Sequence, residues 1–153
     1  MDLNNDDKIY FAGKEILNDW NANFVQCFFG EHLLQNKSNP VAIVESEKTA
    51  LIASIYFEQF LKGKNYIWLA CGSLSYLTAE RCRVLRQRNV TLFPDLKCYE
   101  EWNNKIKELT LLYPETRFTI SNLLELKSTV DEKEKGLDLA DYLIRFNYKD
   151  FQQ

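Results

Sequence analysis

The chain contains 153 residues, of which 46% are hydrophobic and 14% aromatic, enough for a single domain with a substantial core. Its formal net charge of −3 excludes a protein that attracts nucleic acid or anionic membranes over its whole surface, so any nucleic-acid site must be local. No apolar run approaches the roughly 18 residues that span a bilayer, and the acidic first residues are the reverse of a secretory signal. We therefore expect a soluble cytoplasmic protein with no membrane partner.

The cysteines do not form a recognisable zinc site. There is no C-x-x-C pair, and His32 is the only histidine. We interpret the cysteines as small, mostly buried hydrophobic residues in a reducing compartment. They are Cys27, Cys71, Cys82 and Cys98.

The first 40 residues are expected to form an N-terminal extension that packs on the core. Residues 9–12 resemble a short strand that is followed by a turn at Gly13. Apolar residues after Asn23 have helical spacing, and this pattern predicts a helix that continues to about residue 34. Residues 41–146 then form the main domain, and residues 147–153 form a C-terminal tail.

Within the main domain, short apolar runs alternate with segments of helical periodicity. The alternating segments, strands first, are 41–44, 47–61, 66–70, 78–86, 90–93, 99–113 and 117–121. Such alternation is typical of βαβ units, so it predicts a Rossmann-like α/β domain with a four-stranded, mostly parallel sheet flanked by helices. Gly63 is expected to end the first helix. A charge-rich surface segment at 128–135 and a last helix from Asp138 to about residue 146 complete the domain.

Two carboxylates follow predicted strands directly. Glu45 comes after the first strand and Asp95 after the third, so in a parallel sheet both emerge at the same edge. If the two strands are neighbours about 4.8 Å apart, the carboxylates can share one Mg²⁺ ion. The alternative is that Asp95 is only a turn residue after Pro94 and that Glu45 belongs to a helix cap.

The basic residues of interest are few. Lys48 lies in the first turn of helix 47–61, where it either meets a phosphate or is simply exposed. Arg81, Arg83, Arg86 and Arg88 form the one concentrated basic stretch. This stretch either follows a nucleic-acid backbone or is the solvated face of a helix.

Four stretches, in this order, resemble the motifs of one known family. They are 28–34, a Phe-Gly segment; 41–50, a strand that ends in Glu; 92–97, similar to an Asp-x-Asp motif; and 136–143, similar to a closing Asp-x-x-Asp-Tyr-Leu segment. Over roughly residues 24–146 the chain looks like the Toprim domain of primases, topoisomerases and related nucleases. Within that superfamily it resembles uncharacterised Toprim-like proteins of bacterial mobile elements.

The resemblance implies roles for particular residues. Glu45 matches the family's catalytic Glu, a general acid/base, and Asp95 matches the first of two Mg²⁺-binding Asp residues. Lys97 stands where the second Asp is expected. Each unit charge at about 6 Å and an effective dielectric near 20 is worth ~3 kcal/mol before screening, so a lysine there would weaken a bound cation. Lys97 would instead meet a phosphate, and Asp138 or Asp141 would supply the missing carboxylate.

A simpler interpretation of Asp138 is that it caps the last helix, with Asp141 at the third helical position. Ser46 also departs from the family motif, which usually has Gly there.

The sequence leaves more than one function open. The first is a Toprim-like nucleic-acid-processing module of the DNA replication or mobilisation type, catalytically degenerate, with DNA and a helicase or other replication protein as partners. The second is an active Mg²⁺-dependent primase- or nuclease-type enzyme of phosphoryl transfer. The third is a partner-binding module without nucleic-acid contact. A small-molecule phosphate binder is less favoured, because the chain lacks a glycine-rich phosphate loop.

Overall fold

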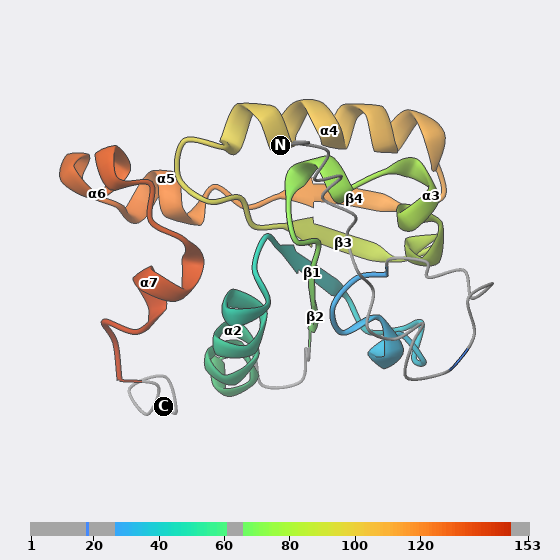
Figure 1. Cartoon of the computed structure of the whole chain (residues 1–153), viewed down its shortest axis with the longest axis horizontal. Helices are drawn as coiled ribbons and strands as arrows, with labels where there is room; N and C mark the ends of the chain where they lie inside the picture. Colours follow the sequence, from blue (N-terminus) through green and yellow to red (C-terminus); the bar gives the residue numbers. More distant parts are fainter. Residues whose placement is uncertain (1–17, 19–26, 61–65, 148–153) are drawn as a thin grey trace, which may run out of the picture.

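A four-stranded parallel sheet forms the centre of the protein (Figure 1). The computed structural model describes residues 18, 27–60 and 66–147. The strands are β1 (Val41–Val44), β2 (Ile67–Ala70), β3 (Asn89–Leu92) and β4 (Arg117–Ile120), in the spatial order β2-β1-β3-β4. Each neighbouring pair runs parallel, and β1 pairs directly with β3. The predicted α/β fold is therefore confirmed.

Helices cover both faces of the sheet, and two of them, α2 and α4, have 14 residues each. The α-helices are α2 (Glu47–Phe60), α3 (Ala79–Cys82), α4 (Tyr99–Leu112), α5 (Leu123–Lys127), α6 (Val130–Lys135) and α7 (Leu139–Leu143). Short 3-10 turns are η1 (Glu31–Leu33), η2 (Leu74–Tyr76) and η3 (Arg83–Leu85). None of the helices that the structure describes is long and apolar enough to cross a membrane.

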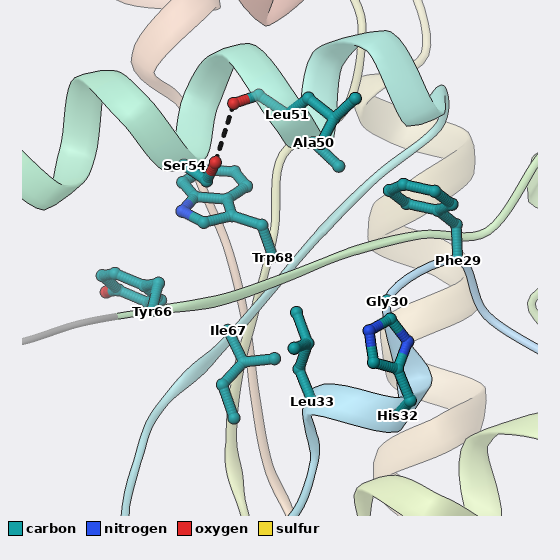
Figure 2. Close-up of a pocket in the computed structure, with 10 residues that line it drawn as sticks. All are labelled: Phe29, Gly30, His32, Leu33, Ala50, Leu51, Ser54, Tyr66, Ile67 and Trp68. Carbon is teal, nitrogen blue, oxygen red and sulfur yellow. Dashed lines mark hydrogen bonds between the residues drawn. The ribbon is translucent and has the colours of Figure 1, made fainter.

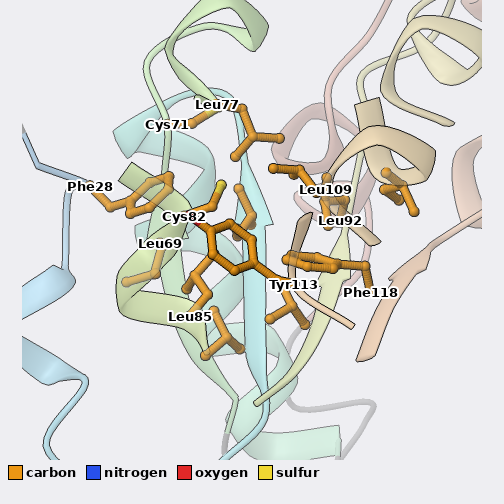
Figure 3. Packing of buried hydrophobic residues seen from close by; sticks show 14 of the residues in the cluster. Phe28, Leu69, Cys71, Leu77, Cys82, Leu85, Leu92, Leu109, Tyr113 and Phe118 are labelled. Carbon is orange, nitrogen blue, oxygen red and sulfur yellow. The ribbon is translucent and has the colours of Figure 1, made fainter. Parts of the chain in front are cut away.

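Strand β1 is buried on both faces, as its unbroken apolar run predicts. Val41 and Ile43 belong to the cluster under α3 and α4, whereas Ala42 and Val44 belong to the cluster under α2 and α7. Figure 3 shows the first cluster, with Phe28 at one side and Phe118 of β4 at the other. Side chains at the ends of β1 and β3 pack into the clusters on both faces of the sheet. This packing fixes where Glu45 and Asp95 leave the sheet.

The helix predicted to reach residue 34 is wrong for residues 27–34. Phe29 instead forms an isolated antiparallel bridge with Ala70 at the free edge of β2, with N···O distances of 3.0 and 3.2 Å. Gly30 then turns the chain with φ of +82°, and only the three-residue η1 follows. The edge strand supplies backbone partners that outweigh the local helical spacing. The strand predicted at 9–12, the turn at Gly13 and the helix end at Gly63 lie outside the described residues.

The C-terminal part has more helix than the sequence pattern predicts. The segment 128–135 contains α6, which begins with a complete capping box between Thr129 and Glu132 and ends at the left-handed Gly136. Helix α5 was not predicted, because its five residues are too few to show a period. Helix α7 ends at Leu143, three residues before the predicted end.

The predicted helix 78–86 is divided. Thr78 caps α3 and accepts a hydrogen bond from the Arg81 N–H at 3.3 Å. After one turn the helix tightens into η3, which ends at Leu85.

Candidate functional site

The polar residues of interest meet at the carboxyl edge of the sheet. Glu45 follows β1 and Asp95 follows β3, and the two strands are parallel neighbours. The Glu45 carbonyl accepts a hydrogen bond from the Gly72 N–H at 2.8 Å, which holds this residue against the exit of β2. The Leu96 N–H donates to the Leu137 carbonyl at 3.1 Å, so the turn after β3 lies beside the segment that leads into α7.

Asp138 caps α7 and also joins α7 to the sheet. One of its oxygens, Oδ1, accepts the Asp141 N–H at 2.8 Å, and Asp141 Oδ2 accepts the Asp138 N–H at 3.3 Å. This capping box confirms the simpler interpretation of Asp138, in which it caps the last helix with Asp141 at the third helical position. The other oxygen, Oδ2, accepts the Thr49 hydroxyl at 2.8 Å and the Lys48 ammonium at 2.9 Å. The N-termini of α2 and α7 therefore share one carboxylate.

Thr49 is a site residue that the sequence analysis missed. Its side chain is buried, with 1% of the residue exposed. The Ser46 hydroxyl donates to Thr49 Oγ1 at 2.9 Å, and the Thr49 N–H donates back to Ser46 Oγ at 3.1 Å. The Ser-x-x-Thr spacing at the start of a helix was the available signal, because the third helical position commonly answers the cap.

Lys48 lies between the two aspartates of α7. Its ammonium is 2.9 Å from Asp138 Oδ2 and 3.6 Å from Asp141 Oδ1, while its side chain stays largely exposed. The hydrogen bond with Asp138 is the main reason why the pKa of Lys48 is raised. Burial alone would raise the pKa of Asp138, but the Asp141 N–H, Lys48 and Thr49 together lower it. Both shifts include a contribution from the contact between Lys48 and Asp138.

Asp95 has the most perturbed carboxyl group of the site. Burial raises its pKa to about 7, and the negative charges of Asp138, Glu45 and Asp141 add to the effect while Lys48 opposes it. These three carboxylates are therefore close enough to act on Asp95. Within residues 27–60 and 66–147, however, no three His, Cys, Asp or Glu side chains are arranged to hold one metal ion as they stand.

Lys97 points away from these carboxylates. Its backbone has φ of +73°, in the left-handed region, and its ammonium donates a hydrogen bond to the Glu134 carbonyl near the end of α6. The charge that faces the acidic residues therefore comes from Lys48. The motif position of Lys97 was identified from the sequence, but the direction of its side chain was not predictable from it.

Two arginines of the basic stretch, Arg81 and Arg88, have structural partners. Arg88 is only 4% exposed, and its guanidinium donates to the Leu34 and Asn36 carbonyls at 2.6 and 2.7 Å. A role for Arg88 in nucleic-acid binding stays a prediction, and in this structure its guanidinium is buried against two carbonyls. Arg81 donates to the Cys27 carbonyl at 2.6 Å and also to carbonyls of residues 71 and 76. Both arginines fasten the segment 27–36 to the fold.

The comparison with known families gives one match. Residues 4–96 match the model of a domain of unknown function, DUF6371, and because this span is more than half of the chain, the protein belongs to that family. The matched span includes Glu45, Lys48 and Asp95 and ends before Lys97 and Asp138. No curated protein and no solved structure matches the chain.

Proposed function

We propose that this member of the DUF6371 family is a Toprim-like nucleic-acid-processing module of the DNA replication or mobilisation type, with weak or no catalysis of its own. The observation that carries the proposal is the carboxyl edge of the sheet. There Glu45 and Asp95 follow neighbouring strands, and the charges of Glu45, Asp138 and Asp141 all act on Asp95. Ligands of α/β sheets bind at this edge.

Magnesium is the cofactor that fits this edge best. Glu45 and Asp95 would hold the ion, with water completing its shell, since Mg²⁺ commonly uses one or two protein carboxylates. A bound Mg²⁺ would supply positive charge to a phosphate. Burial is the main cause of the raised pKa of Asp95, but the negative charges of Asp138, Glu45 and Asp141 add to it, and a bound cation would offset those charges. Asp138 is a weaker third ligand, because Lys48 and Thr49 already occupy its outward oxygen.

Weak catalysis follows from the same contacts. Lys48 neutralises part of the charge of Asp138 and Asp141, so the edge attracts a divalent cation less than four free carboxylates would. The second Asp of the Toprim motif is replaced by Lys97, which bonds to a backbone carbonyl instead. Phosphoryl transfer depends on cations that offset the phosphate charge, so this arrangement favours binding over turnover.

Lys48 is the cation best placed to meet a phosphate. Its side chain is 57% exposed, and it lies in the first turn of α2, a 14-residue helix whose positive dipole end faces the same edge. With Arg81 and Arg88 engaged by carbonyls and a net charge of −3, the grip on DNA is expected to be weak and to fall steeply with salt. A helicase or another replication protein would then keep this module bound to the DNA.

The test measures DNA binding, nucleotide incorporation and strand cleavage with Mg²⁺ or Mn²⁺. Wild type is compared with the variants Glu45→Gln and Lys97→Asp. The control is Glu108→Gln, which removes an exposed carboxylate on α4 that does not belong to the carboxyl-edge site. We expect salt-sensitive DNA binding that Glu108→Gln leaves unchanged, and little turnover.

Two outcomes favour the other functions. Robust wild-type turnover that Glu45→Gln abolishes would identify an active primase- or nuclease-type enzyme, with Asp138 as the carboxylate that replaces the missing Asp. No binding at low salt, even by Lys97→Asp, would leave a partner-binding module that does not contact nucleic acid.

A further inference from the structure

The free edge of β2 is only partly covered. Ile67 and Cys71 donate their N–H groups toward β1, to the Pro40 and Val44 carbonyls, so by alternation the amides of Trp68 and Ala70 face away from it. Ala70 exchanges both hydrogen bonds with Phe29. The chain then leaves the ladder at Gly30, and no described residue accepts a hydrogen bond from the Trp68 N–H. Among the described residues, one rung of a fifth strand is present and the next has no partner.

An open groove lies at the missing rung. It has a volume of about 570 Å³ and is lined by β2, by α2 and by the segment around η1. Figure 2 shows Leu51 and Ser54 of α2 on one side of β2, and Leu33 and His32 on the other. Gly30 forms one end, and its backbone approaches the Trp68 carbonyl so closely that an added Cβ would lie 2.8 Å from that oxygen.

Leucine side chains line the groove on both sides of the strand edge, Leu51 on one and Leu33 on the other. None of the described lining residues is Asp, Glu, Lys or Arg, and Leu51 and Leu33 are each more than half exposed. Proteins usually protect a free edge with charged residues, proline or a covering segment. An uncharged groove beside an unpaired backbone amide suits a β-strand, whose own amides pair with the edge while its side chains enter both apolar sides.

We propose that this groove binds an extended, uncharged, apolar peptide segment of a partner protein, which adds to β2 as a fifth strand beside Trp68. The existing bridge between Phe29 and Ala70 supports this occupant, because the added strand continues an edge pairing that the chain itself begins. The inference does not depend on the nucleic-acid function, since the groove includes none of the acidic residues at the carboxyl edge.

The probe is a fluorescein-labelled synthetic peptide of about seven residues, the usual length of a short strand, rich in valine and ending in lysine for solubility. Its control has the same sequence with alternate backbone nitrogens methylated, which removes the N–H groups needed for pairing. Fluorescence anisotropy is measured with the full chain, with Leu51→Arg in the groove and with Ile55→Arg outside it. Leu51 and Ile55 both lie on α2 and are 56% and 53% exposed, so both variants should fold.

We expect the full chain to bind the first peptide, the methylated peptide to bind at least about tenfold more weakly, and Leu51→Arg to lose about as much. Ile55→Arg should bind like wild type. Hydrogen exchange gives an independent measure: the Trp68 amide should exchange rapidly in the free monomer and slowly after peptide is added.

Several results overturn the proposal. Equal binding of both peptides, or equal loss in both arginine variants, excludes pairing in the groove. A Trp68 amide that is already protected in the free monomer means that the chain covers its own edge. A concentration-dependent dimer that only Leu51→Arg disrupts makes a second copy the occupant.

Discussion

The carboxyl edge of the sheet and the free edge of β2 belong to the same sheet but present opposite chemistry. At the carboxyl edge, residues at the ends of β1 and β3 and at the start of α7 bring three carboxylates close enough to act on Asp95, and Lys48 pairs with two of them. At the β2 edge, the groove offers apolar side chains and a backbone amide without a charged residue among its described lining. The difference shows that parallel strand ends gather residues from distant segments, whereas a side edge offers mainly its backbone. Changes of charge should therefore affect the first region, and changes of backbone the second.

The largest effect is expected for Asp138→Ala. The substitution removes the cap of α7 and leaves the buried Thr49 hydroxyl without its acceptor, so we expect a loss of about 3 kcal/mol in the free energy of unfolding. Thr129→Ala removes the cap of α6, which forms an equivalent capping box on an exposed segment, and should cost only about 1 kcal/mol. Urea unfolding measures both. Equal losses would mean that the contact with Thr49 contributes nothing to stability.

The next effect concerns the β2 edge. Gly30→Ala combines a φ of +82° with a Cβ that would lie 2.8 Å from the Trp68 carbonyl oxygen, so a loss of about 2 kcal/mol or more is expected. Gly136→Ala has a similar φ of +68° but nothing closer than 3.8 Å, so it should cost about 1 kcal/mol. Thermal unfolding of the two variants separates steric overlap from backbone strain. If the Gly30 variant were as stable as the Gly136 variant, the backbone around Trp68 would have moved to accommodate the added Cβ without a loss of stability.

A smaller effect distinguishes the two lysines of the carboxyl edge. Lys48→Met frees Asp138 and Asp141, so the affinity for Mn²⁺ should rise about fivefold, equivalent to ~1 kcal/mol. Lys97→Met should leave the affinity unchanged, because that ammonium is bonded to the Glu134 carbonyl. Isothermal titration calorimetry gives both values. If only the Lys97 variant bound Mn²⁺ more tightly, the positive charge that opposes the cation would be that of Lys97 and not that of Lys48.

The smallest effect depends on pH. Because the pKa of Asp95 is raised to about 7, the native state keeps a proton that the unfolded chain releases near pH 4. Stability from this group is therefore present at low pH and is lost as the pH rises toward and through 7. In EDTA, Asp95→Asn should raise the Tm above that of wild type by about 2–4 °C at pH 8 and by less at pH 5. Asp131→Asn, at an exposed carboxylate on α6, is the control. A difference between Asp95→Asn and wild type that does not change with pH would contradict the assignment.

The sheet was predictable because its signal is local. Each strand is a short apolar run between turn residues, and this pattern needs no knowledge of distant contacts. The same logic placed Glu45 and Asp95 at one edge, since parallel strands share a direction. The helix predicted through residues 27–34 was wrong because Phe29 pairs with Ala70, a partner 41 positions away that local spacing cannot reveal.

The details of the candidate site were less accessible for the same reason. Whether Lys97 faces the acidic residues depends on a left-handed turn and on the end of α6. The burial of Arg88 depends on carbonyls 52 and 54 positions earlier in the chain. The cap at Asp138 could be predicted from sequence, but its second role, as acceptor for Lys48 and Thr49, required the packing of α7 against α2.

The arginine fastening of the segment 27–36 has a consequence for the order of folding. Arg81 and Arg88 donate hydrogen bonds to carbonyls of this segment, and they lie 52 to 54 positions after those carbonyls in the sequence. The segment can therefore be fixed only after α3 and the start of β3 have formed. We therefore expect it to dock late during folding and to detach early when the protein opens locally. Each such opening would separate Phe29 from Ala70 and briefly lengthen the unpaired edge of β2. We therefore expect that weakening either guanidinium contact would make this opening more frequent.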